Sequence, residues 1–241
     1  MSQSISSTAN VLLQMLSDDD RELLQPHLTR VDMAVGKTLV DADKPIEFIH
    51  FLEGGIGSIV STSEEGVKTE IGIFGREGAS GMSLLHSTDR SPYSAFMQVN
   101  GGTALRVDMQ AFCEVVEKSS TFRHLLLRYT EALAIQVGQT VVANAHHQME
   151  SRLARWLLMC HDRVDGDTIA LTHQFMAIMI GAQRTGVTVT LHILEGVGMI
   201  RATRGQVVIL NREKLEEAAG DGYGKSEAEY RRLIGPFGRL D

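Results

Sequence analysis

The 241-residue sequence predicts an α+β fold: an N-terminal antiparallel β-roll, a long central helix, and a C-terminal helix-turn-helix followed by a β-hairpin. Three observations lead to this prediction. Short apolar runs punctuated by glycine fill residues 31–107, a pattern typical of a jelly roll. A helical repeat of apolar residues runs through 122–146. Two short helical patterns flank Gly181, and two strand-like runs flank a tight turn at 203–206.

The first hundred residues change from helical to strand-like patterns. Residues 10–28 are a capped, amphipathic helical region in which Ser17 begins a second helix. No helical pattern separates the runs that follow, so we expect neighbouring strands to pair antiparallel. The predicted strands are 36–40, 46–52, 57–62, 69–74, 93–99 and 104–107.

The helix expected at 122–146 follows a shorter one at 109–117 and carries the spacing of a coiled-coil seam. We expect it to dimerise, with two polar members of the seam fixing the register. An intramolecular core remains an alternative, because further apolar side chains widen the stripe (Leu125, Leu127, Ile135 and Val141). The expected seam consists of Leu126, Leu133, Val137, Thr140 and Asn144.

The next helix, expected at 148–164, has an apolar face that includes Trp156. Its basic residues are expected to point outward (Arg152, Arg155, His161 and Arg163). A final amphipathic helix at 226–234 is expected to dock on the C-terminal domain through Tyr230, Leu233 and Ile234. Earlier in the chain, Arg76 and Glu77 are expected to form a weak surface pair.

The helix-turn-helix pattern begins at Thr172, a good N-cap, and its first helix ends at Gly181. The second helix, 183–195, places Val187, Leu191 and Leu194 on one face. Residues 187–190 are all β-branched and would indicate a strand if read alone, but the helical spacing outweighs that propensity. The opposite face is polar and basic, with Gln183, Arg184, Thr185, Thr188 and His192 on or near it.

Charge is distributed unevenly along the chain. The net charge is −7, which argues against general affinity for nucleic acid. Residues 171–214, however, carry five basic and two acidic side chains, so this segment is +3 and the remainder is −10. An acidic body with a basic C-terminal segment suits a protein that docks on DNA through one face.

These features together resemble the bacterial winged-helix transcription factors of the cyclic-AMP receptor and fumarate-nitrate regulator family. The resemblance implies a cyclic-nucleotide-binding-like effector domain at 1–119, a dimerisation helix at 120–147 and a winged helix-turn-helix domain with a C-terminal extension at 148–241. The segments that carry it are 171–174, 181–184, Val187, Leu191 and 194–200, together with the glycine framework Gly36, Gly54, Gly55, Gly66, Gly75, Gly78 and Gly81.

The resemblance implies a homodimeric, sequence-specific transcription regulator whose partner is double-stranded DNA. RNA polymerase and an unidentified small molecule are candidate further partners. Thr185 stands where the family often has glutamate, and Val189 where it has a second arginine, so the usual half-site is not expected. The residues expected to contact DNA are Thr172, His173, Gln183, Arg184, Thr185, Thr188 and Arg204, the last in the wing.

The effector pocket implied by the resemblance departs from a cyclic-AMP site. In that site a glutamate binds the ribose and an arginine binds the phosphate. Alignment places Ala79 at the acid and Tyr93 at the arginine, so we expect the effector, if there is one, not to be cyclic AMP. Arg90 turned inward is an alternative cation. The expected pocket residues are Gly78, Ala79, Ser80, Gly81, Met82, Tyr93 and Ser94.

Other classes of function lack support in the sequence. Cys113 and Cys160 are too few for an iron–sulfur cluster or a zinc motif, and the histidines show no ligand pattern, so no metal or cofactor is expected. Enzyme motifs are missing, and an enzyme is not expected. No apolar run could span a membrane and Met1–Asn10 does not resemble a signal peptide, which predicts a cytoplasmic protein. The alternative function is a nucleotide-sensing subunit that regulates a protein partner.

Overall fold

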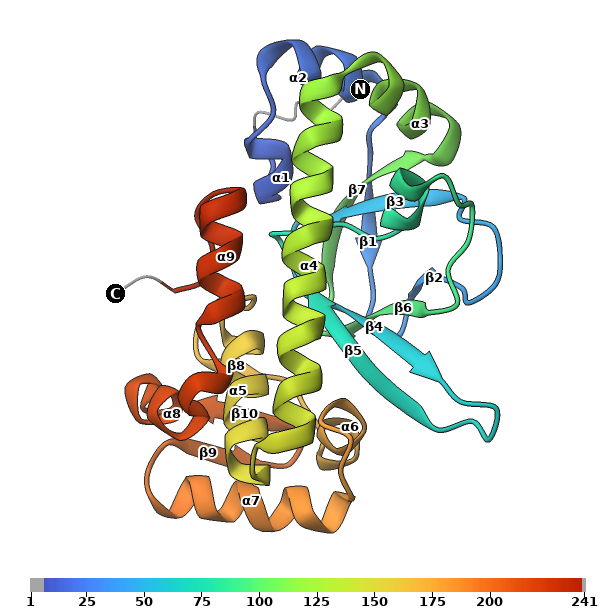
Figure 1. The fold of residues 1–241 in the computed structure, drawn as a ribbon. Coiled ribbons are helices and arrows are strands. Elements are labelled where there is room, and N and C mark those ends of the chain that lie inside the picture. The colour runs from blue at the N-terminus through green and yellow to red at the C-terminus, as the bar shows by residue number, and fades with distance from the viewer. Residues whose placement is uncertain (1–6, 240–241) are drawn as a thin grey trace.

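The structure is a computed structural model that describes residues 7–239, so the first six residues of Met1–Asn10 lie outside the described residues. It has the α+β architecture that the sequence predicts. A β-roll lies on one side of the long helix α4 (Ser120–His146), and the helix-turn-helix lies at the end of that helix (Figure 1). No helix within residues 7–239 is long and apolar enough to cross a membrane.

Helices α1 (Val11–Gln14) and α2 (Asp18–Leu24) begin where the sequence places caps, at Asn10 and Ser17.

The β-roll consists of two antiparallel sheets, with strand orders β1-β7-β3 and β2-β6-β4-β5. Every predicted strand is present within two residues of its expected bounds. The edge strand β1 was not predicted separately, because its side chains do not alternate cleanly between buried and exposed. The strands are β1 (Thr29–Met33), β2 (Thr38–Val40), β3 (Phe48–Leu52), β4 (Ile56–Thr62), β5 (Lys68–Phe74), β6 (Ser94–Val99) and β7 (Gly102–Asp108).

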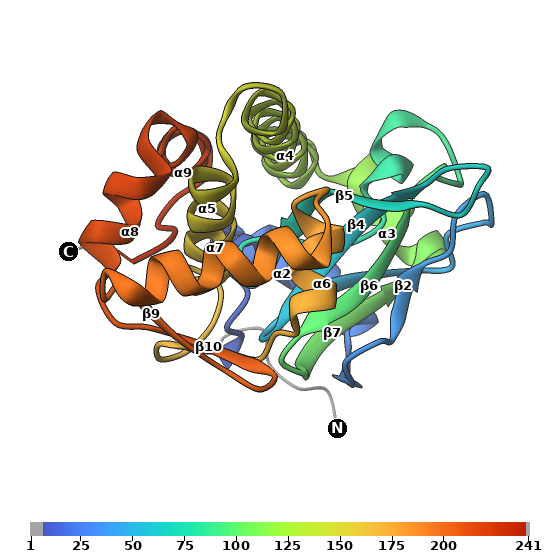
Figure 2. The same cartoon turned by 90° about the horizontal axis from the view of Figure 1, so that it is seen from below.

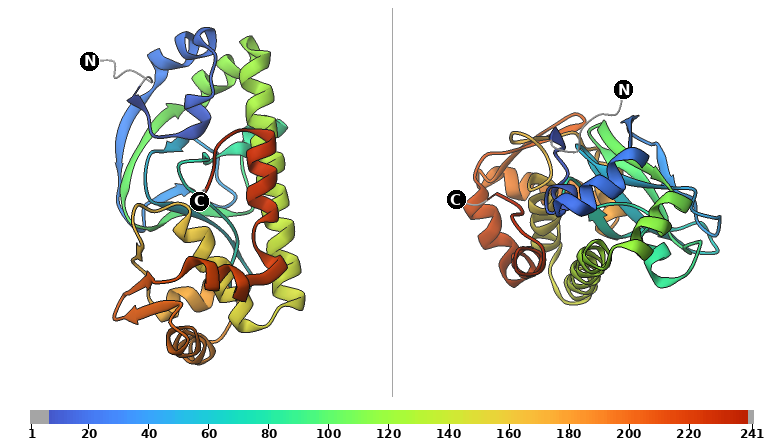
Figure 3. Two further views of the ribbon diagram at one scale, coloured as in Figure 1. Left: turned by 90° about the vertical axis from the view of Figure 1, so that its left-hand side faces the viewer. Right: turned by 90° about the horizontal axis from the view of Figure 1, so that it is seen from above.

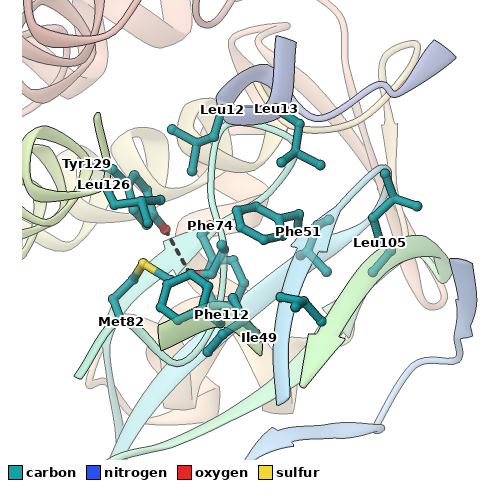
Figure 4. Close-up of a cluster of buried hydrophobic side chains, with 14 of the residues drawn as sticks. Leu12, Leu13, Ile49, Phe51, Phe74, Met82, Leu105, Phe112, Leu126 and Tyr129 are labelled. Atoms are coloured by element: carbon teal, nitrogen blue, oxygen red, sulfur yellow. Dashed lines mark hydrogen bonds between the residues drawn. The ribbon is translucent and has the colours of Figure 1, made fainter. Parts of the chain in front are cut away.

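Helix α4 follows α3 (Met109–Lys118) and packs one face against the β-roll. Leu126 and Tyr129 enter the same cluster of buried side chains as Phe74, and the Tyr129 hydroxyl donates a hydrogen bond to the Ala79 carbonyl at 3.3 Å (Figure 4). Leu126 has no exposed surface. The prediction that it lies in an intermolecular seam is therefore wrong, and this part of α4 belongs to the core of its own chain.

The other residues of the expected seam also face their own chain to a large extent. Leu133 and Val137 are half-buried and line a cavity between α4 and the β-roll. The Thr140 hydroxyl donates to the Gln136 carbonyl in its own helix at 3.0 Å. Asn144 accepts a hydrogen bond from Arg152 at 3.2 Å. The alternative of an intramolecular core describes this face better.

The C-terminal part combines a small antiparallel sheet, in the order β8-β10-β9, with five helices. Helix α7 lies at the far end of the molecule, and no element of residues 7–239 covers its outer side (Figure 2). The elements are α5 (Met149–His161), β8 (Thr168–Ile169), α6 (His173–Met179), α7 (Arg184–Gly196), β9 (Ile200–Thr203), β10 (Gln206–Ile209), α8 (Arg212–Ala219) and α9 (Lys225–Leu233).

The basic residues of α5 and the turn after it do not point to solvent as expected. Arg155, His161 and Arg163 are each at most 4% exposed. The Arg163 guanidinium donates to Glu77 at 2.8 Å, which joins the C-terminal part to the β-roll. Glu77 is thus a buried partner of Arg163, whereas the neighbouring Arg76 pairs with Asp165. Arg163 also donates to the Met159 carbonyl at 2.7 Å, and Arg155 donates to the Gly222 carbonyl at 2.8 Å, so acceptors inside the chain offset part of the cost of burying these arginines.

The C-terminal extension docks on the N-terminal part of the chain. Helix α9 lies beside α4 (Figure 3), and Tyr230 and Ile234 join the core cluster of the β-roll. The Tyr230 hydroxyl donates to the Glu77 carbonyl at 2.6 Å, and its ring contacts Phe237 at 4.9 Å between centroids. The expected docking on the C-terminal domain is wrong, because an apolar helix face indicates burial without indicating the partner.

Candidate nucleic-acid interface

The helix-turn-helix forms through local contacts that the sequence signals. The Thr172 hydroxyl caps α6 by accepting from the Phe175 N–H at 3.2 Å. Gly181, with φ of 58°, makes the turn, a conformation that favours glycine. Val187 and Leu191 of α7 are buried against the rest of the domain. The β-branched run is therefore helical, because burial of this face outweighs its local strand propensity.

The outer face of α7, the helix seen from below in Figure 2, carries both polar and apolar side chains. Gln183, Arg184 and Thr185 are exposed at its first turn, and the Gln183 side chain makes no cap hydrogen bond. Thr188 is half-buried; its hydroxyl lies 3.0 Å from His173 Nδ1 and donates to the Arg184 carbonyl. The start of α7 therefore presents the Arg184 guanidinium, the free Gln183 amide and small side chains to a DNA groove.

Val189 also belongs to this face, although it is not among the residues predicted to contact DNA. Its side chain is 60% exposed one helical turn after Thr185. The signal was available, since Val189 lies four residues after Thr185 and does not share the spacing of the buried Val187 and Leu191. Because its side chain is apolar, Val189 stands out in the sequence only as a departure from the second arginine of the family pattern.

The predicted wing is the hairpin of β9 and β10, whose turn contains Arg204 and Gly205. Glu195 of α7 accepts a hydrogen bond from the Ala202 N–H at 3.1 Å, which fixes the hairpin beside the helix. Arg204 is exposed at the tip. The wing therefore presents a cation next to the face of α7.

One of the five basic residues counted in 171–214 is not available on this surface. Arg212 is bound to Asp162 at 2.9 Å and to Glu216 at 2.8 Å, so it stabilises the domain and does not add to a DNA-facing patch. Arg184, Arg201 and Arg204 are exposed and make no ion pair or side-chain hydrogen bond with any described residue. These three cations remain available for phosphates or bases.

The expected effector pocket corresponds to a cavity of about 380 Å³ between the β-roll and α4. Five of the seven expected residues line it: Ala79, Ser80, Gly81, Met82 and Tyr93. Gly78 does not, because it lies against the Tyr129 ring, and Ser94 bonds to the Val60 carbonyl instead. Arg90 is also outside the lining and pairs with Asp89 at 2.9 Å, so the alternative of an inward-turned arginine is not observed.

Two sets of contacts connect the β-roll and α4 to the helix-turn-helix. Arg152 bonds both Asn144 of α4 and the Ile180 carbonyl at the turn between α6 and α7. Glu70 of β5 accepts from Ser58 at 2.6 Å and from Trp156 of α5 at 2.7 Å. Burial raises the pKa of Glu70 from 4.5 to about 7, despite these hydrogen bonds and a nearby arginine. The arrangement of the two halves therefore depends on buried polar contacts.

An N-terminal β-roll with a cavity, a connecting helix and an exposed recognition helix beside a basic wing define the class of winged-helix regulators with a sensor-like domain. The comparisons agree. Residues 151–218 match the family model described as a Crp-like helix-turn-helix domain. The helix-turn-helix domain is of the Crp-like type, and the chain as a whole is similar to transcription regulators of the Crp/Fnr family.

Two relatives of similar sequence are described as global nitrogen regulators. The one from Synechocystis sp. is 25% identical over 210 residues, covering 81% of this chain and 90% of that protein. The one from Nostoc sp. is 27% identical over 184 residues, covering 72% and 81%. FixK2 from Bradyrhizobium japonicum is similar in structure, with a TM-score of 0.69 at 16% identity, covering 80% of this chain and 98% of that chain. This last similarity concerns the fold alone.

Proposed function

We propose that the protein is a homodimeric, sequence-specific DNA-binding regulator that inserts α7 of each copy into the major groove. The observation that carries the proposal is the exposed face of α7, whose unpaired Arg184 lies beside a wing with an unpaired Arg204. A helix in the major groove can read bases, and a wing can hold the adjacent backbone. As a regulator of transcription it would work in the bacterial cytoplasm, with RNA polymerase as a candidate partner.

The side chains divide into two roles by their position. Gln183, Arg184, Thr185 and Thr188 lie at the start of α7, where they would meet base edges. Arg204 in the wing would contact phosphate, as would Thr172 or His173 at the start of α6. Thr172 and His173 are both used within the domain, the first as a cap and the second against Thr188, so they would position the two helices as well.

The proposed dimer uses a face of α4 that is rotated from the expected one. Stepping one residue along a helix turns the face by about 100°. Each member of the expected seam is followed, one residue later, by a member of an exposed stripe. The residues of this stripe are spaced alternately by four and three positions, which is the coiled-coil pattern. Leu127 and Val141 in it are 37% and 62% exposed. The stripe, here called the exposed seam, consists of Leu127, Glu131, Ala134, Gly138, Val141 and Ala145.

The proposal is tested by selecting an operator from random duplex DNA and then comparing two variants. Arg184→Ala should lose about 1–3 kcal/mol of binding free energy to the selected operator and discriminate less at one base position. Arg204→Ala should weaken binding to all sequences alike and flatten the salt dependence. Identical behaviour of the two variants would contradict the assigned roles. Failure to enrich any duplex would instead favour a regulatory subunit that acts on a protein.

A further inference from the structure

We propose that the cavity between the β-roll and α4 binds an uncharged, mainly apolar small molecule, which acts as the effector. This inference rests on the proposed function, because an effector presupposes a regulator. The cavity volume of about 380 Å³ lies within the range of small-molecule sites. The chemistry of its walls indicates the class of ligand.

The walls of the cavity are predominantly aliphatic. The lining includes Ile46, Ile59 and Ile71 of the β-roll and Leu133 and Val137 of α4. Hydroxyl groups and one imidazole supply its polar atoms, and the side chains of Tyr93 and His86 are exposed to solvent. A ligand could bury an apolar body among the aliphatic side chains and keep one neutral polar group near the exposed residues.

An anionic ligand would find no arginine or lysine from residues 7–239 in the walls of the cavity. Among the described residues that line the cavity, none is Arg, Lys, Asp or Glu. The Ser80 hydroxyl is engaged by the His50 backbone N–H at 3.1 Å and lies 3.2 Å from His50 Nδ1. Burial, with Arg106 and Lys37 nearby, lowers the pKa of His50 to about 4, so this imidazole is neutral at pH 7 and gives no cation. A phosphate or carboxylate buried among the aliphatic side chains would therefore lose its hydration without an arginine or lysine to pair with.

The position of the cavity connects a ligand to the proposed dimer. Thr130, Leu133, Ala134 and Val137 bring α4 into its lining. Ala134 is also a member of the exposed seam, so a ligand would contact the helix that joins the two copies. A molecule bound more tightly in one arrangement of α4 than in another would shift the population of that arrangement. Such a ligand would thus regulate DNA binding.

The experiment compares 1-octanol with octanoate, which differ in charge but little in shape, and includes cyclic AMP as a larger anion. The uncharged fluorescent probe N-phenyl-1-naphthylamine is titrated into the full chain and displaced with 1-octanol, octanoate or cyclic AMP. Thermal unfolding is followed in parallel, since a ligand of the native state raises the Tm. We expect the probe to bind and 1-octanol to displace it at a concentration at least about tenfold lower than octanoate or cyclic AMP.

Two variants fill the cavity, and one matched variant leaves it open. Leu133→Trp adds a large ring inside the cavity, and Val137→Phe is a milder filling variant should the first fail to fold. Val67→Trp places the same ring on the hairpin between β4 and β5, where Val67 is 62% exposed. The folded filling variants should bind the probe at least about tenfold more weakly, and Val67→Trp should bind like the natural chain.

Three results would overturn the proposal: no binding of the probe, equal or tighter binding of octanoate or cyclic AMP, or undiminished binding in a folded filling variant. DNA binding to the selected operator is measured separately with each variant. If the natural chain recognises the operator but does not bind the probe, this inference alone is refuted, whereas absence of operator recognition in the natural chain would refute the proposed function.

Discussion

Replacing Glu70 with Gln is expected to remove a pH dependence from the stability of the fold. Glu70 is 4% exposed at the contact between β5 and α5, where Ser58 and Trp156 donate to its two oxygens at 2.6 and 2.7 Å. Gln can accept from the indole and donate to the hydroxyl, so the variant preserves the shape of the contact. It removes only the ionisation.

The magnitude follows from the pKa of Glu70, which burial raises from 4.5 to about 7. Between these two pH values the folded state binds more protons than the unfolded state. The free energy of unfolding therefore falls as pH rises above 4.5, and the loss is complete above about pH 7. At 1.36 kcal/mol per unit of pKa, the loss is ~3 kcal/mol. Arg155, which lies near Glu70 and is 4% exposed, offsets part of the cost of the buried charge.

The assay is urea unfolding between pH 5 and pH 8. Glu70→Gln should gain stability relative to the natural chain as pH rises, by up to ~3 kcal/mol, because the variant has no carboxylate to bury. Glu64→Gln, on the exposed turn after β4, is the control and should follow the natural chain. If the free energies of Glu70→Gln and the natural chain stay parallel across this range, the interpretation of Glu70 is refuted.

Three further predictions test other parts of the structure. Val141→Glu places a charge in the exposed seam, so it should convert the proposed dimer to a monomer in sedimentation experiments; an unchanged dimer mass would place the interface elsewhere. Tyr230→Phe removes the hydroxyl that donates to Glu77 and should cost about 1 kcal/mol in unfolding, and no loss would mean that α9 does not dock there. Val189 should contact a thymine methyl, so replacing that thymine with deoxyuridine should weaken operator binding by the natural chain about fourfold. If deoxyuridine weakens binding by Val189→Ala to the same extent, the contact is refuted.

Much of the fold could be predicted because local signals agree with the tertiary structure. Caps at Asn10, Ser17 and Thr172 begin helices where expected, and the glycine-punctuated runs form the β-roll. The second helix of the helix-turn-helix required a choice between β-branched propensity and helical spacing. The spacing was the better guide, since it reports which side chains are buried and burial provides more free energy than propensity.

The remaining features depend on which surfaces meet, and periodicity does not specify that. The apolar stripe of α4 is wide enough to serve two faces, so the expected seam was rotated by one residue from the exposed one. The pairing of Arg163 with Glu77 joins residues 86 positions apart, and no local pattern announces it. The docking of Tyr230 on the β-roll has the same origin. For the cavity, the sequence identified the turn at 79–82 but not the contribution of α4.

Binding to operators with different half-site spacings tests the central claim most directly. Two copies of α7 held by a two-fold dimer should bind half-sites whose centres lie about one helical turn, ~10 bp, apart or a multiple of this. We predict that inserting about half a turn, ~5 bp, between the selected half-sites abolishes the added affinity of the second half-site and that a full turn restores part of it. Equal affinity at every spacing, or full affinity for a single half-site, would contradict the account.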